Sequence, residues 1–441
     1  MHPALRIPEI VSLIFETMVP DVPPQKADLD THTLASLSRT CKYFSEPALN
    51  ALWKKQRGLG NLLSCFPEDL WNVKYQDWKY QEFLRVPANL ALVRNILPSD
   101  WMRAAYYAKR VRDVCIPEEA EGQLVLPFLS ISLPTSPFLF PNLRTLEYNA
   151  DDPALHGALP MLLPPTLKHV FFTTPNDIKF LSALPALPVR CPALTEIDFT
   201  SVETGPLNFY PRYCHAVSLL LLRFDRLERV CVDDLEFDAL KHLADMPTLK
   251  AVKINFEQDE SPLHHVDLSP GRLGVNPLPA ITSIIVNPAS HDMTVFLVSA
   301  VARRPLIELT IEMKYAVTPV VAGSLLAHLC DCINFEKIEI LEISSTLHSG
   351  DSARNEALDP ISQQFTHLLQ RLQATPKTRL RITIHFPGVF RIKNQQLLEI
   401  GRTLGPTSLE DLTWIDVEAT TQRRLVVLGS SNEDTGQGPR T

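Results

Sequence analysis

The sequence predicts an α/β protein in which a small helical module precedes an irregular solenoid of parallel strands alternating with helices. Two patterns predict it: an apolar spacing that recurs through most of the chain, and three short helical patterns near the N-terminus. The length of 441 residues also exceeds what one compact core needs, at roughly 100–200 residues per domain. We expect a helical module over 1–57, a helical linker or cap over 58–110, the solenoid over 111–428 and a disordered tail over 429–441.

The recurring pattern is an apolar residue followed by apolar residues three and five positions later, often just after a proline. The step of two positions is that of a short strand with one buried face. The copies are Val111/Val114/Ile116, Leu143/Leu146/Tyr148, Leu167/Val170/Phe172, Leu194/Ile197/Phe199, Leu227/Val230/Val232, Leu249/Val252/Ile254, Ile281/Ile284/Val286, Leu306/Leu309/Ile311, Ile338/Leu341/Ile343 and Leu409/Leu412/Trp414, with a degenerate copy at Leu380/Ile382/Ile384.

Helical patterns lie between these copies, for example over 238–243 and over 290–302, where Ser290 is a candidate N-cap. One strand and one helix cannot bury their apolar faces alone, so neighbouring units must stack. The sequence therefore predicts an irregular leucine-rich-repeat solenoid. The alternative is an ordinary α/β domain whose strands happen to alternate with helices.

The composition limits the function classes. Hydrophobic residues make up 45% and charged residues 21%, which is typical of a folded protein. The net charge of −8 provides no overall basic field, so we do not expect nucleic acid as a partner. No apolar run reaches the roughly 18–20 residues that span a bilayer, and no secretory signal is recognisable, so we expect no membrane association. Eight scattered cysteines, mostly in apolar surroundings, predict a reducing cytoplasmic or nuclear location.

The sequence lacks the common catalytic and nucleotide-binding motifs, such as G-x-G-x-x-G, G-x-x-x-x-G-K-S/T, G-x-S-x-G and H-E-x-x-H. We therefore predict a non-enzymatic protein without a cofactor; an enzyme of an unrecognised type stays open as an alternative. One set of residues weakly resembles a metal cluster, but its pattern is more typical of core residues. It consists of His264, His265 and Asp267, and of His328 near Cys330 and Cys332.

The N-terminal residues predict three short helices. Pro8 suits the first turn of a helix, and an apolar stripe follows over residues 10–15. After a polar loop at about 21–30 comes a second apolar pattern over 34–44, and Pro47 is expected to open a third helix. Such a module has too small a core to be stable unaided, so a partner or the domain behind it must complete the core.

This module resembles the F-box. The resemblance covers about residues 4–54, and the loop over 20–32 is longer than in the common pattern. It depends on Leu5, Pro8-Glu9-Ile10, Ile14-Phe15, Leu34, Leu37, Cys41, Lys42, Phe44, Leu49 and Leu52-Trp53. With segments 65–71 and 98–101, the whole chain is similar to F-box proteins with leucine-rich-repeat-like solenoids that are abundant in mushroom-forming fungi.

The resemblance implies a substrate-recognition adaptor of an SCF-type (cullin–RING) ubiquitin ligase. The F-box would bind the Skp-type adaptor of the ligase core, and the solenoid would hold an unidentified protein substrate. The alternative is a leucine-rich-repeat interaction scaffold that serves no ligase. The adaptor-binding residues implied are Leu5, Pro8, Ile10, Ile14, Leu37 and Trp53, although the same residues could pack only with one another.

A substrate would contact the concave face of the solenoid, where the residues between the buried strand positions point. Acidic residues outnumber basic ones there, so a basic partner segment is expected. The alternative is an ordinary solvated sheet face. The candidate contacts are Glu147, His169, Phe171, Glu196, Asp198, Arg229, Lys253 and Glu308.

Overall fold

The computed structural model divides the chain into two compact units, residues 1–209 and 210–441, which are described separately. Leu5 and the predicted tail over 429–441 lie outside the described residues. The described residues are 6–19, 27–73, 90–117, 125–134, 136–149, 153–174, 178–201, 210–256, 262–263, 266, 268–269, 271–315, 317–345, 364, 367–368, 370–371, 380–385, 409–414 and 423–425.

Three helices form the N-terminal module, as the sequence predicts: α1 (Pro8–Thr17), α2 (Ala27–Thr40) and α3 (Lys42–Lys54). Two boundaries differ from expectation. Helix α2 begins inside the stretch predicted to be a loop, because polar residues suit an exposed first helical turn as well as a loop. Helix α3 begins at Lys42, so Pro47 lies within it. The extended backbone of Cys41 separates α2 from α3 and divides the pattern over 34–44 between two helices.

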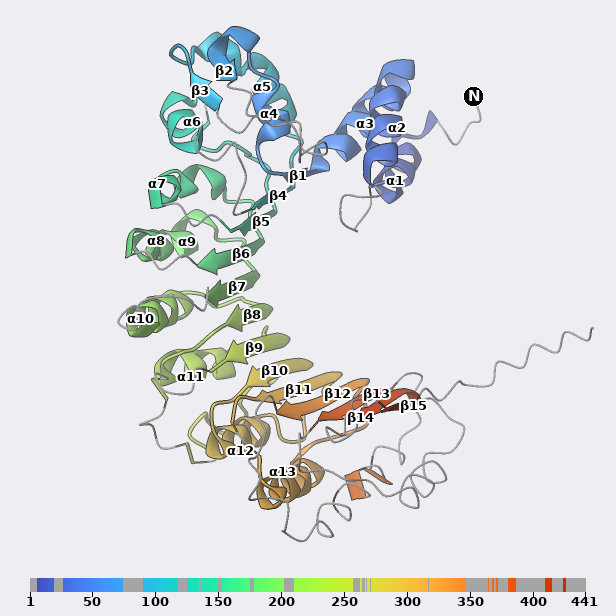
Figure 1. Cartoon of the computed structure of the whole chain (residues 1–441), viewed down its shortest axis with the longest axis vertical. Coiled ribbons are helices and arrows are strands. Elements are labelled where there is room, and N and C mark those ends of the chain that lie inside the picture. Colours follow the sequence, from blue (N-terminus) through green and yellow to red (C-terminus); the bar gives the residue numbers. More distant parts are fainter. Residues whose placement is uncertain are drawn as a thin grey trace, which may run out of the picture. The chain divides into compact units, whose positions relative to one another are not determined.

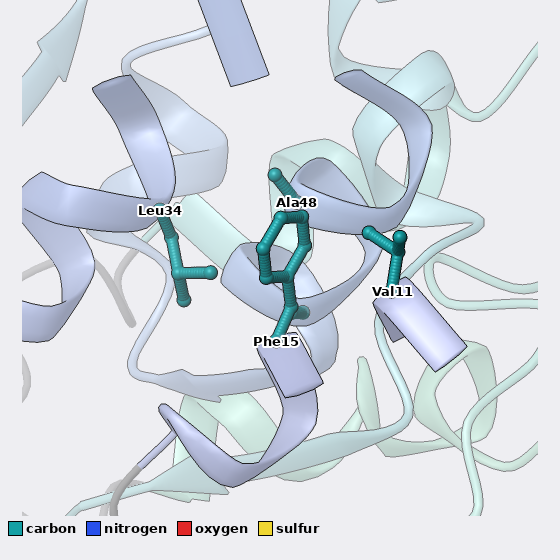
Figure 2. Close-up of a cluster of buried hydrophobic side chains, with 5 residues drawn as sticks. Val11, Phe15, Leu34 and Ala48 are labelled. Carbon is teal, nitrogen blue, oxygen red and sulfur yellow. The ribbon is translucent and has the colours of Figure 1, made fainter. Parts of the chain in front are cut away.

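A small apolar core holds the three helices together (Figure 2). It consists of Val11, Phe15, Leu34, Ala48 and Ala51. The ring of Phe15 also meets Phe44 edge to face, with 5.7 Å between ring centroids. Five buried residues, two of them alanine, remove little apolar surface from water, so this core contributes little stability on its own.

The first unit contains a parallel sheet, and the helices that connect its strands, α6 to α9, lie on one side of it (Figure 1). Each strand pairs with the next through parallel registers. The strands, in order, are β1 (Lys55–Arg57), β4 (Asp113–Ile116), β5 (Thr145–Tyr148), β6 (His169–Thr174) and β7 (Glu196–Ser201). The helices are α6 (Leu126–Ser132), α7 (Pro153–His156), α8 (Ile178–Ala183) and α9 (Leu187–Arg190), with 3₁₀ turns η5 (Leu159–Leu162) and η6 (Leu184–Ala186).

The sheet begins earlier in the chain than predicted. Strand β1 directly follows α3 and pairs with β4, so residues 55–57 belong to the sheet rather than to the helical module. The segment expected to be a helical cap contains helices but also an antiparallel strand pair. Its elements are α4 (Gly60–Leu63), η2 (Glu68–Leu70), β2 (Trp71–Val73), β3 (Leu90–Leu92), η3 (Pro98–Asp100) and α5 (Trp101–Ala108).

The second unit repeats the parallel arrangement and ends with one antiparallel strand, β15, paired to β14. Its helices are α10 (Tyr210–Leu221), α11 (Phe237–Asp245), α12 (His291–Ala300) and α13 (Pro319–Cys332). Its strands are β8 (Arg229–Val232), β9 (Ala251–Asn255), β10 (Ser283–Asn287), β11 (Glu308–Met313), β12 (Ile340–Ser345), β13 (Leu380–His385), β14 (Leu409–Trp414) and β15 (Arg423–Leu425). Ser290 caps α12 as predicted, because its hydroxyl accepts a hydrogen bond from the backbone N–H of Met293 at 3.3 Å.

The predicted apolar positions form the core. From the copy at Val111 to the copy at Ile338, every member is buried. Equivalent members face one another across neighbouring strands, as Leu146 does with Val170, so each strand adds one row to a continuous apolar layer. The α/β architecture of parallel strands alternating with helices is therefore confirmed. The copies at Leu380 and Leu409 form strands β13 and β14, although the side chains that define those copies lie outside the description.

Replacing Phe172 with alanine should destabilise the protein by about 3–5 kcal/mol, because Phe172 is fully buried and its cavity cannot collapse completely. Its ring stacks on Phe199 at 5.4 Å and meets Phe180 edge to face at 5.2 Å. Phe171→Ala is the matched control, since Phe171 lies on the opposite face of β6 and is only half-buried. Urea unfolding followed by circular dichroism measures the stability of both variants. Equal losses of stability would contradict the placement of Phe171 and Phe172 on opposite faces of β6.

Candidate functional site

Helix α1 exposes a stripe of large aliphatic side chains. Two apolar residues of the helix, Val11 and Phe15, point into the module core. The others stay in solvent: the exposed fractions are 45% for Ile7, 37% for Ile10, 67% for Leu13 and 43% for Ile14. Residues three, four and seven positions apart lie on one side of a helix, so these four form a single strip. We call them the α1 apolar surface.

This strip has the character of a binding surface. Single exposed apolar residues are common on proteins, but four aliphatic side chains over two consecutive helical turns leave a contiguous patch in water. The side chains carry no hydrogen-bonding group, so a partner would remove them from water without leaving a polar atom unsatisfied.

The structure divides the residues predicted to bind the adaptor. Pro8, Ile10 and Ile14 are exposed on α1. Leu37 is half-buried and packs against the module core, and the Trp53 ring stacks on Tyr107 of α5 with centroids 4.5 Å apart. Leu37 and Trp53 therefore make contacts within the chain, and their role as adaptor contacts stays a prediction.

Sequence reasoning missed Ile7 and Leu13 as site residues. The apolar stripe over 10–15 was recognised, but its two sides were not distinguished. At 100° per residue, Val11 and Phe15 lie 40° apart, whereas Leu13 lies 160° from Phe15.

Polar contacts fix the module to the segment that leads into β4. The buried guanidinium of Arg110 pairs with the Glu46 carboxylate at 2.8 Å and donates to the amide oxygen of Asn50. The Tyr106 hydroxyl donates to Glu46 at 2.9 Å. The hydrogen bond from Arg110, followed by the one from Tyr106, holds the pKa of Glu46 below its usual value. The orientation of α3 is therefore set by specific contacts and not only by chain connectivity.

In the first unit, the face of the sheet opposite the helices presents five of the predicted substrate contacts. The register aligns Glu147, Phe171 and Asp198 across β5, β6 and β7. His169 lies beside Glu196, with 3.3 Å between Nδ1 and the carboxylate, so the two form an ion pair when the imidazole is protonated. The five residues therefore share one surface.

The second unit places Arg229, Lys253 and Glu308 on β8, β9 and β11. None of the three is the direct register partner of another, because Ala251 pairs with Arg229 and Ser283 pairs with Glu308, but the alternation along the strands places all three on the same face of the sheet. The Ser283 hydroxyl donates to the Glu308 carboxylate at 2.6 Å, and this bond already uses part of the hydrogen-bonding capacity of the carboxylate. Five of the eight predicted contacts thus belong to the first unit and three to the second.

Two asparagines at the ends of strands in the second unit, Asn255 and Asn287, were not predicted as site residues. The Asn255 amide donates to Asp233 at 3.2 Å, and the Asn287 amide donates to Glu312 at 3.4 Å. These side chains form pairs across neighbouring strands. The signal in the sequence was an asparagine placed directly after the period-two apolar pattern.

Within the described residues, no group of three or more His, Cys, Asp or Glu side chains is arranged to hold a metal ion. Cys332 Sγ lies 3.6 Å from His328 Nε2, while Cys330 is buried and its pKa is raised to about 11, chiefly by that burial. His264, His265 and Asp267 lie outside the described residues. No described helix is both long and apolar enough to cross a membrane.

No family model matches the sequence, and no curated protein matches it. The functional interpretation must therefore be argued from the surfaces themselves.

The thiol of Cys115 provides a chemical test of the sheet face in the first unit. Its pKa is raised to about 12, chiefly by burial and further by the charge of Glu147 and a hydrogen bond with it. Because the thiolate is the reactive form, alkylation of Cys115 by iodoacetamide should be slow at pH 8. Its rate should rise about tenfold per pH unit up to about pH 11.

Glu147→Gln should lower the pKa of Cys115 and accelerate its alkylation at pH 8, because the substitution removes a negative charge that disfavours the thiolate. Peptide mapping by mass spectrometry measures the modification at this residue. Glu312→Gln, which alters a carboxylate in the second unit, is the control. An alkylation rate that levels off near pH 9, or one unaffected by Glu147→Gln, would show that Cys115 and Glu147 are wrongly placed.

Proposed function

We propose that this protein is a non-enzymatic adaptor whose N-terminal module is an F-box and whose strand–helix units form a leucine-rich-repeat solenoid. The α1 apolar surface would dock onto the Skp-type adaptor of an SCF ubiquitin ligase, and a sheet face would hold a protein substrate. One observation carries the proposal: the module buries only a few side chains while four large aliphatic residues of α1 remain in water.

The α1 apolar surface is large enough to anchor an interface. Complete burial of an aliphatic side chain contributes about 1.5–3 kcal/mol, so burying the exposed halves of four such residues contributes roughly 3–6 kcal/mol. Association costs at least about 4 kcal/mol, so this surface needs additional polar contacts around it. A small apolar centre with a polar rim is the usual anatomy of a protein–protein interface.

The proposed activity requires no bond chemistry by this chain. A receptor that binds the ligase core at one end and a substrate at the other raises the effective concentration of the substrate near the ubiquitin-loaded enzyme. Rigid attachment favours this role, because a fixed module limits the volume that the substrate explores. The contacts among Arg110, Glu46 and Asn50 supply such an attachment on the module side.

The first unit favours a basic substrate segment. Its sheet face combines Glu147, Glu196 and Asp198 around the half-buried ring of Phe171. An apolar centre surrounded by carboxylates suits a segment in which Lys or Arg flanks an apolar residue. His169 lies beside Glu196 on the same face of the sheet and would add positive charge only when protonated.

The double variant Ile10→Asp/Ile14→Asp should weaken binding to the purified Skp-type adaptor at least about tenfold, a loss of about 1.4 kcal/mol or more. The physical reason is that two carboxylates would be desolvated at the centre of an apolar interface. Biolayer interferometry with the full chain measures the affinity. Trp53→Ala is unsuitable as a test, because Trp53 stacks on Tyr107 and its loss would disturb the fold.

Ser36→Asp is the control, since it adds a carboxylate, half the charge of the double variant, at an exposed position of α2 in the same module. Both variants should keep the far-ultraviolet circular dichroism spectrum of the parent. An adaptor that binds the parent and the double variant equally would rule out the α1 apolar surface as the docking site. If the parent itself binds no Skp-type adaptor, a scaffold that serves no ligase becomes the better interpretation.

A further inference from the structure

The first unit contains a cavity of about 430 Å³ whose walls are strongly cationic. It lies between helices α1 and α3 on one side and the turns that precede β4 and β5 on the other. Five basic side chains line it, with one carboxylate and two amides. The lining residues are Lys54, Lys109, Arg110, Arg112, Arg144, Glu16, Asn50 and Asn142.

The parallel sheet explains why these charges gather. Lys54, Arg112, Arg144 and Lys168 each directly precede a strand, and backbone hydrogen bonds join them in sequence. The N–H of Arg112 donates to the carbonyl of Lys54 at 2.9 Å, that of Arg144 to Arg112 at 2.6 Å, and that of Lys168 to Arg144 at 2.8 Å. Neighbouring strands are about 4.8 Å apart, so the four residues form a column along the N-terminal ends of the strands.

Only part of this charge is neutralised within the described chain. Lys54 pairs with Glu16 at 3.0 Å, and Arg110 pairs with Glu46 at 2.8 Å. Arg112 donates to the backbone carbonyl of Asn142 at 3.0 Å. Among the described residues, Arg144 forms no ion pair. Even when Glu46 and the neighbouring Asp113 are counted with Glu16, the five cations exceed the nearby carboxylates.

The cavity is also preorganised. The Asn142 side-chain amide donates to the backbone carbonyl of Lys109 at 2.7 Å, and the backbone carbonyl of Asn142 accepts from the Arg112 guanidinium at 3.0 Å, so one residue ties the Lys109 backbone to the Arg112 side chain. The guanidinium of Arg110 is buried and already oriented by Glu46 and Asn50. Burial, and after it the charge of Arg144, lowers the pKa of Arg112, as expected for cations gathered without sufficient counter-charge.

We propose that this cavity binds phosphate groups, presented either by a small polyphosphorylated molecule or by phosphorylated side chains of a protein. Arginine forks match the oxygen spacing of a phosphate and bind it through two parallel hydrogen bonds. Five cations are more than a single carboxylate needs, which favours an anion of high charge. The volume is many times that of one water molecule, at roughly 30 Å³ each, and so accommodates more than one phosphate.

An occupied cavity would link the helical module to the sheet. Glu16 belongs to α1, Asn50 and Lys54 belong to α3, and Arg112 and Arg144 precede strands of the sheet. A ligand that contacts both walls binds only the folded arrangement and therefore stabilises it against unfolding. The inference is independent of the proposed adaptor function.

Isothermal titration calorimetry of the full chain with sodium tripolyphosphate tests the proposal. We expect saturable binding with a Kd below about 100 μM at physiological ionic strength, where weak surface attraction is largely screened. Arg112→Gln/Arg144→Gln should weaken binding at least about tenfold. Arg226→Gln/Lys337→Gln removes two exposed cations from the second unit and should change the Kd less than about twofold.

Thermal unfolding distinguishes a variant that has lost phosphate binding from one that has lost its fold. Without ligand, Arg112→Gln/Arg144→Gln should melt close to the parent temperature, because the substitution relieves repulsion between like charges as well as removing the contact to Asn142. Tripolyphosphate should raise the melting temperature of the parent and of the control but not that of the double variant. Should the double variant fail to fold, Arg144→Gln alone, which leaves the Arg112 hydrogen bond in place, replaces it.

A peptide carrying two phosphoserines distinguishes the sources of the phosphate. Tighter binding of the peptide than of tripolyphosphate would assign the cavity to a phosphorylated protein, and the reverse order would assign it to a small free ligand. Two results would overturn the proposal: no saturable binding of either probe by the parent, or binding that the control substitutions weaken as much as Arg112→Gln/Arg144→Gln does.

Discussion

The structure depends on one constraint: each strand–helix unit buries its apolar side chains only by stacking on its neighbours. Leu146 packs in register with Val170, and Val170 with Ile197, so the layer continues as long as the register holds. That register also determines what is not buried. Because side chains alternate along a strand, Glu147, Phe171 and Asp198 must share the opposite face. The residues that directly precede the strands must likewise form one column along the N-terminal ends of the strands. The candidate substrate face and the cationic cavity are thus consequences of the same packing.

The sequence predicted the parallel α/β architecture because its signal is local and periodic: an apolar triad within six residues can be recognised without knowing its neighbours. Boundaries were less well predicted where two principles compete. Pro47 was expected to begin a helix, yet α3 begins at Lys42, because Cys41 interrupts the preceding helix first. The cationic cavity could not be predicted from spacing, since Lys54 and Arg144 are far apart in sequence and meet only through strand pairing. Arg110 and Arg112 are close in the sequence, but their partners Glu46, Asn50 and Asn142 are distant in it.

The helical module illustrates how a small domain divides its apolar residues between stability and binding. Val11 and Phe15 supply the core contacts of α1, and the remaining aliphatic residues of the helix stay in solvent. A module with so little buried surface gains stability from its attachment. Trp53 on Tyr107, together with Arg110 between Glu46 and Asn50, provides that attachment through one aromatic stack and a charged network. The Trp53 ring therefore contributes to the fold.

Two of the three proposed binding surfaces of the first unit, the α1 apolar surface and the cationic cavity, meet on helix α1. Ile14 belongs to the α1 apolar surface, while Glu16, two residues further along, forms part of the cavity wall and pairs with Lys54. A phosphate in the cavity would compete with Glu16 for Lys54 and so alter the contact that holds the end of α1. Any such coupling must be reciprocal: if an anion changes the affinity of α1 for a protein partner by some factor, that partner changes the affinity for the anion by the same factor. The shared helix therefore offers a physical route by which phosphate could tune adaptor binding without contacting the adaptor.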